Sequence, residues 1–79
     1  MVTAYVLINC DHGKADETIE SLQHIESVKE VHGTFGAYDI VAKVEHIRKE
    51  KLREVIIWNI KNIEPVRSTL TLMGTEFQN

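Results

Sequence analysis

The segment from residue 34 to residue 44 constrains the fold of this 79-residue chain most, because two β-type runs meet there around a glycine. Gly36 has no Cβ and takes positive φ at little steric cost, so the chain can reverse direction at this point. The run at residues 39–45 then places its apolar side chains at alternate positions, on one face of a strand. These inward residues are Ile40, Ala42 and Val44. Two antiparallel strands joined at Gly36 are therefore predicted.

The rest of the chain supplies two more strands and two amphipathic helices. Content of β-branched and aromatic residues predicts strands at residues 2–10, 28–35, 39–45 and 66–73. Apolar residues at helical spacing predict helices between residues 11 and 27 and from residue 48 to residue 63, before Pro65. Their stripes are Ala15, Ile19, Leu22 and Ile25, and then Leu52, Val55, Ile56, Ile60 and Ile63. The order βαββαβ indicates an α+β, ferredoxin-like fold with two helices on one face of a four-stranded antiparallel sheet.

The second face of this sheet is expected to lack a cover within the chain. Strict alternation places Val66, Ser68, Leu70 and Leu72 inward. The second face would then carry Tyr5, Leu7, Val41, Thr69, Thr71 and Met73. Such a face is too apolar for water, which predicts a homodimer packed sheet to sheet. Ile57 and Trp58 lie at the edges of the second helical stripe, where further dimers could dock.

Composition narrows the class of protein. The chain is expected to form one domain, residues 1–79, and its formal net charge of −3 argues against a nucleic-acid-binding module. A single cysteine, Cys10, excludes an internal disulfide. No apolar run approaches the roughly 18 residues of a membrane span, and the N-terminus does not resemble a signal peptide. A cytoplasmic protein that does not contact membranes is expected.

The turn itself suggests a binding site for a small zwitterion. Tyr38 and Asp39 directly follow Gly36, so a phenol and a carboxylate lie beside freed backbone amides. Asp39 could bind an ammonium group while the amides bind a carboxylate. The alternative is a hairpin whose Asp39 only caps the turn. Spacing alone does not choose between them.

The order of elements, the turn at residues 34–39 and the threonines of the last strand together resemble a known family. They are similar to the effector-binding domain of the Lrp/AsnC, or feast/famine, transcriptional regulators, also called the RAM domain. The resemblance covers residues 2–73. It implies a dimeric α/β barrel that assembles into rings such as octamers or decamers, with amino acids bound between neighbouring dimers. The implied ligand residues are Thr34, Gly36, Ala37, Tyr38, Asp39, Thr69 and Thr71.

Two features depart from the family pattern. Pro65 occupies the position of a glycine that usually precedes Val66. The helix-turn-helix domain that normally precedes this module is also missing from the sequence. The resemblance therefore implies a stand-alone sensing domain that acts without direct DNA binding, in company with a full-length regulator.

An enzyme and a purely structural assembly module are the alternatives. The same fold hosts small monooxygenases and haem-degrading proteins, but the stripes facing the space between helices and sheet hold no evident catalytic group. Cys10 and His12 could form a nucleophile pair only with a third, orienting group. The four histidines lack metal-ligand spacing. No catalytic residue, metal or cofactor is therefore expected.

Overall fold

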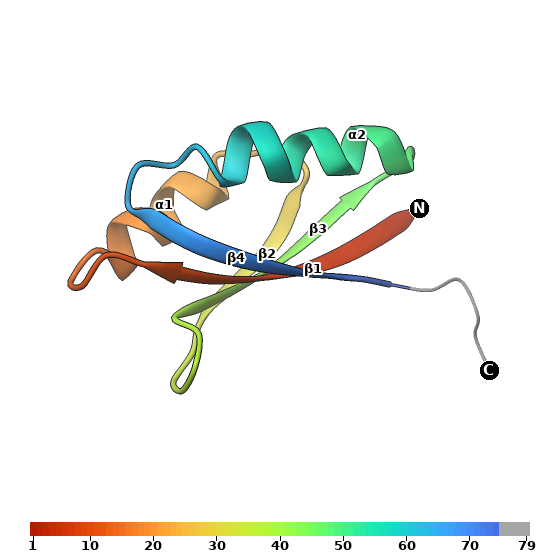
Figure 1. The fold of residues 1–79 in the computed structure, drawn as a ribbon. Helices are drawn as coiled ribbons and strands as arrows, with labels where there is room; N and C mark the ends of the chain where they lie inside the picture. Colours follow the sequence, from red (N-terminus) through yellow and green to blue (C-terminus); the bar gives the residue numbers. More distant parts are fainter. Residues whose placement is uncertain (75–79) are drawn as a thin grey trace.

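The computed structural model describes residues 1–74 of the chain, and its strands and helices follow one another in the predicted order, with the second helix divided into two parts (Figure 1). The strands are β1 (Val2–Cys10), β2 (Val28–Gly33), β3 (Ile40–His46) and β4 (Val66–Met73). The helices are α1 (Ala15–Gln23), α2 (Lys49–Glu54) and the π-helix η1 (Val55–Ile60). The second strand ends two residues earlier than predicted, at Gly33.

The four strands form one antiparallel sheet in the order β2-β3-β1-β4, with the helices on one face (Figure 1). This confirms the ferredoxin-like architecture. The core lies between helices and sheet, where Ile8, Ile40 and Val44 of the central strands are completely buried. Leu22, Leu52 and Ile60 complete it from the helices. The apolar side chains at alternate positions of the strands and at helical spacing in the helices thus meet in one core layer.

The second helix changes its winding half-way. It begins as α2 and continues as η1, whose end is marked by a bond from Lys61 N–H to the Ile56 carbonyl oxygen (3.1 Å) five residues earlier. Leu52, Ile56 and Ile60, four residues apart, are the buried side chains. An α-helix would turn such residues about 40° further with each step, whereas the wider π-turn compensates for that drift. The helix predicted over residues 48–63 is therefore present but ends at Ile60, and its second half is a π-helix.

In most of strand β4, the residues predicted to face the helices lie on the open face of the sheet, and those predicted to lie on the open face meet the helices. Cys10 pairs with Val66 but Asn9 pairs with Ser68, so β4 has one extra residue, Arg67, in a β-bulge. From Ser68 onward the bulge reverses the predicted alternation, because the side-chain period of a strand is two. Thr69, Thr71 and Met73 therefore lie opposite Ile8, Val6 and Ala4 on the helix-facing side. Leu70 and Leu72 lie opposite Leu7 and Tyr5 on the open face.

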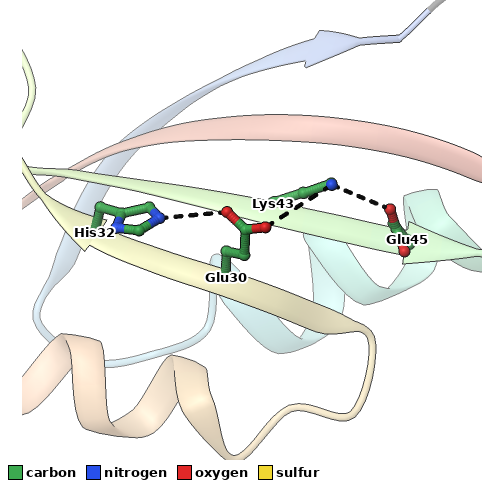
Figure 2. Close-up of polar contacts among 4 residues, drawn as sticks. All are labelled: Glu30, His32, Lys43 and Glu45. Atoms are coloured by element: carbon green, nitrogen blue, oxygen red, sulfur yellow. Dashed lines mark hydrogen bonds and ion pairs between the residues drawn. The ribbon is translucent and has the colours of Figure 1, made fainter.

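The open face of the sheet therefore has an apolar half and a charged half. Tyr5, Leu70 and Leu72, on β1 and β4, are 42%, 45% and 50% exposed. The charged half on β2 and β3 is a chain of side-chain hydrogen bonds and ion pairs (Figure 2). It joins His32 to Glu30 (3.3 Å), Glu30 to Lys43 (3.9 Å) and Lys43 to Glu45 (3.5 Å).

Two glycines provide a matched test of this packing. A Cβ on Gly74 would lie 2.9 Å from the Thr3 carbonyl oxygen, whereas one on Gly33 would meet only Ile19 Cδ1 at 3.8 Å. We expect Gly74→Ala to lower the free energy of unfolding by about 1–3 kcal/mol, because the contacted backbone cannot move aside. Gly33→Ala should leave it unchanged or raise it by about 0.4–1 kcal/mol. Urea unfolding at one fixed protein concentration measures both, and equal midpoints for the two variants would contradict the close approach at Gly74.

Candidate functional site

The turn between β2 and β3 is held by its own hydrogen bonds. Thr34 N–H donates to the Asp39 carbonyl oxygen (2.9 Å), and the Thr34 hydroxyl donates to the Tyr38 carbonyl oxygen (2.7 Å). Gly36 has φ +112°, as the predicted reversal requires. The loop projects from the sheet on the side opposite the helices (Figure 1), and Phe35 is fully exposed on it. Thr34 thus has a structural role in closing the turn.

The Asp39 carboxylate is bonded to strand β1 and does not cap its own turn. Its Oδ2 accepts a hydrogen bond from Cys10 N–H (3.0 Å), and the Cys10 thiol donates more weakly to the same oxygen (3.8 Å). The Asp39 N–H in turn donates to the Ile8 carbonyl oxygen (3.0 Å). Asp39 therefore joins the end of β1 to the start of β3. The simple turn-cap alternative named the wrong partner, because that partner is 29 residues distant in sequence.

The Cys10 thiol is unsuited to nucleophilic chemistry. Burial raises the pKa of this thiol above its ordinary value, and the neighbouring Asp39 charge raises it further, although a hydrogen bond with Thr18 acts in the opposite direction. The thiolate is the nucleophilic form of cysteine, so a raised pKa disfavours attack at neutral pH.

Asp39 lines a hollow of about 270 Å³ at this end of the sheet. Two further charged residues line the same hollow, Asp11 after β1 and Arg67 at the bulge of β4. The Arg67 Nε lies 3.6 Å from Asp11 Oδ1. The remaining lining residues are Cys10, His12, Gly13 and Ala15. The hollow thus combines two carboxylates with one guanidinium, a set of charges that complements a small zwitterion.

The residues predicted to bind one ligand lie in different parts of a single protomer. Of the predicted turn residues, only Asp39 lines this hollow; Thr34, Gly36, Ala37 and Tyr38 do not. Thr69 lies in a separate hollow beside Arg67 and Lys61, and Thr71 in another beside η1. Asp11 and Arg67 were not predicted as site residues. The β-bulge that places Arg67 beside Asp11 has no recognisable pattern in the sequence.

Within residues 1–74, no cluster of three or more His, Cys, Asp or Glu side chains is arranged to hold a metal ion. A membrane-spanning helix is likewise not found in this part of the chain.

The sequence model for the Lrp/AsnC ligand-binding domain matches residues 3–76, nearly the whole chain. The chain belongs to the Lrp/AsnC family. The curated relatives of this ligand-binding domain are named as HTH-type transcriptional regulators and not as enzymes.

Individual relatives agree with this assignment. An HTH-type transcriptional regulator of Pyrococcus furiosus, PF0250, is 32% identical over 91% of this Lrp/AsnC domain, which covers 50% of that protein. The domain thus spans about half the length of the curated relatives that it matches.

Solved structures share the fold. TTHA0845 from Thermus thermophilus superposes with a TM-score of 0.92 at 32% identity, with 100% of this chain and 99% of that chain covered. AsnC of E. coli superposes with a TM-score of 0.86 at 25% identity, over 99% of this chain and 54% of AsnC. The regulator NMB0573 from Neisseria meningitidis, solved as a complex with L-Met, has the same fold at 11% identity and a TM-score of 0.83, over 99% of this chain and 53% of that one.

Proposed function

We propose that this domain senses a free amino acid and transmits its presence through the assembly of copies. The observation that carries the proposal is the hollow in which Asp39, Asp11 and Arg67 converge from three different elements. Membership of a family of ligand-binding domains supports a small ligand. The charges of both signs in the hollow support a zwitterion such as an amino acid.

The ligand ammonium would lie against the carboxylates of Asp39 and Asp11. Oδ2 of Asp39 is already bonded to Cys10 N–H, so Oδ1 is the oxygen offered to the ligand. The ligand carboxylate would pair with Arg67, whose planar guanidinium suits bidentate binding. Arg67 would then exchange its contact with Asp11 for one with the ligand, a small change because that pair is mostly exposed.

Neighbouring copies would bring the remaining predicted residues to the ligand. Thr34, Gly36, Ala37 and Tyr38 belong to a projecting loop, and Thr69 and Thr71 line other hollows of the protomer. These groups would reach one amino acid only where a second copy presents them. Binding at such an interface would couple occupancy to assembly, since each event stabilises the other.

The assembly that we propose is a homodimer formed by the open faces of two sheets, giving a dimeric α/β barrel. Further docking of dimers would give an octamer or a decamer. Trp58, which is 67% exposed, and Ile57, which is 47% exposed, offer apolar contact area on the second helix. A full-length regulator of the family would be a partner in mixed assemblies. The net charge of −3 supports action without direct DNA contact, beside regulators in the cytoplasm.

A melting screen of the purified protein against all twenty amino acids tests the sensing role. An amino acid at about 100 times its dissociation constant should stabilise the fold by roughly 2.7 kcal/mol. For a domain of this size the melting temperature should rise on the order of 10 °C. The N-acetyl derivative and the matching amine, which lack one charge each, should give much smaller shifts. If no amino acid at ~10 mM, about tenfold above a dissociation constant of ~1 mM, moves the transition, the sensing proposal is wrong and a purely structural assembly role is favoured.

A further inference from the structure

A second hollow lies between η1 and the edge strand β4. Its volume is about 250 Å³. It is lined by Arg53, Ile56, Ile57, Lys61, Thr71 and Met73. Of this set, only Thr71 is also assigned to the proposed amino-acid site.

The winding of the helix gathers three of these residues along one side. Arg53, Ile57 and Lys61 are each four residues apart, and all three line the hollow. In a continuous α-helix this row would rotate by about 80° over eight residues. The π-turns between Val55 and Ile60 oppose that rotation, so the row stays directed toward β4. π-helical segments are rare and occur frequently at functional sites.

The charges of the hollow have one sign. Arg53 and Lys61 are exposed cations, and none of the lining residues within residues 1–74 is a carboxylate. Within residues 1–74, neither cation forms an ion pair, although the chain as a whole carries a net charge of −3. Cations that are gathered without a counter-charge at a concave surface favour an anion there.

The floor of the hollow is apolar. Ile56 is 5% exposed, while Ile57 is 47% exposed and Met73 is half-buried. The Thr71 hydroxyl, on the helix-facing side of β4, is the neutral hydrogen-bonding group of the set. A ligand that complements the hollow therefore has an apolar body and one anionic end.

We propose that this hollow binds a small aliphatic monocarboxylate, with its carboxylate between Arg53 and Lys61 and its alkyl body on Ile57 and Met73. A free ammonium group on the ligand is disfavoured, because two cations and no anion of the described residues 1–74 would face it. The ligand therefore differs in class from the amino acid proposed for the Asp39 hollow. The two hollows share no lining residue.

Titration of the intact, methyl-labelled protein with 4-methylpentanoate tests the proposal. A ligand with so few atoms should bind with a dissociation constant on the order of millimolar and shift the methyl resonances of Ile56, Ile57 and Met73. Leucine, which differs by its ammonium group, should shift them at least fivefold less at the same concentration. The uncharged 4-methylpentanamide and acetate, which lacks the alkyl body, should also bind at least fivefold more weakly.

Charge variants with a matched control complete the experiment. The Arg53→Gln, Lys61→Gln double variant should bind 4-methylpentanoate about fivefold more weakly, since each exposed pair contributes modestly. The Lys49→Gln, Lys51→Gln double variant removes the same charge from the same helix outside this hollow and should change binding less than twofold. Asp39→Asn should also leave binding unchanged. Equal loss in both double variants, equal binding of the amide, or loss of binding in Asp39→Asn would each overturn the second site.

Discussion

The Leu70→Lys, Leu72→Lys double variant should be a folded monomer, whereas the wild-type protein should have a mass of several 9.1 kDa chains. Both leucines are about half exposed on the open face of the sheet, beside Tyr5. In a sheet-to-sheet dimer they would be buried, and four lysines per dimer would then lose their water without a partner. Each unpaired buried charge costs several kcal/mol, so the dimer should dissociate.

Light scattering at micromolar concentration measures the masses, and far-ultraviolet circular dichroism checks that the variant is folded. Ile47→Lys is the matched control, because Ile47 is a more exposed apolar residue that lies beyond β3 and outside the sheet. It should retain the wild-type mass. A wild-type monomer, or a double variant that keeps the full assembly, would show that the open face is not the dimer interface.

The two functions of Asp39 should separate in a pair of substitutions. Asp39→Ala removes the acceptor for Cys10 N–H and leaves a largely buried donor unpaired, so it should lower the free energy of unfolding by about 1–3 kcal/mol. Asp39→Asn keeps an acceptor oxygen and should melt close to the wild type. Both lose the charge that the ligand ammonium needs. A charge-assisted contact contributes about 1.5–3 kcal/mol, so amino-acid affinity should fall by roughly 10- to 150-fold in both.

Melting series of the wild type and both variants, each with and without the best amino acid from the screen, measure the two effects together. Arg67→Gln should weaken the same ligand without destabilising the fold, because its side chain is mostly exposed. Asp39→Asn that retains the full ligand-induced shift would reduce Asp39 to a structural residue and would place the ligand elsewhere.

Secondary structure and the central core were predictable because local periodicity determines them. Ile8, Ile40 and Val44 face the helices in the structure as alternation predicts, and Leu22, Leu52 and Ile60 lie on the predicted helical stripes. Gly36 takes the positive φ expected of it. Each of these properties depends on residues within one or two turns of the chain. The family resemblance rests on the same order of elements and is confirmed.

The candidate site was predictable only in part. Asp39 lines a charged hollow as the turn suggested, but its partner Cys10 and its neighbours Asp11 and Arg67 come from other elements. Residues distant in sequence meet according to how β1 pairs with both β3 and β4. The spacing of residues within the turn does not predict how these strands pair.

The sequence by itself determined the order of the elements, the inward faces of β1 and β3 and the reversal at Gly36, because these follow from local steric preference and hydrophobic period. The tertiary structure alone decided which face of β4 meets the helices. The bulge at Arg67 reverses the faces of the residues that follow it, and strict alternation does not predict this reversal. The tertiary structure likewise decided the π-turns that align Arg53 with Lys61. In both places packing against the neighbouring element selects a local irregularity of the backbone, and that packing exists only in the folded chain.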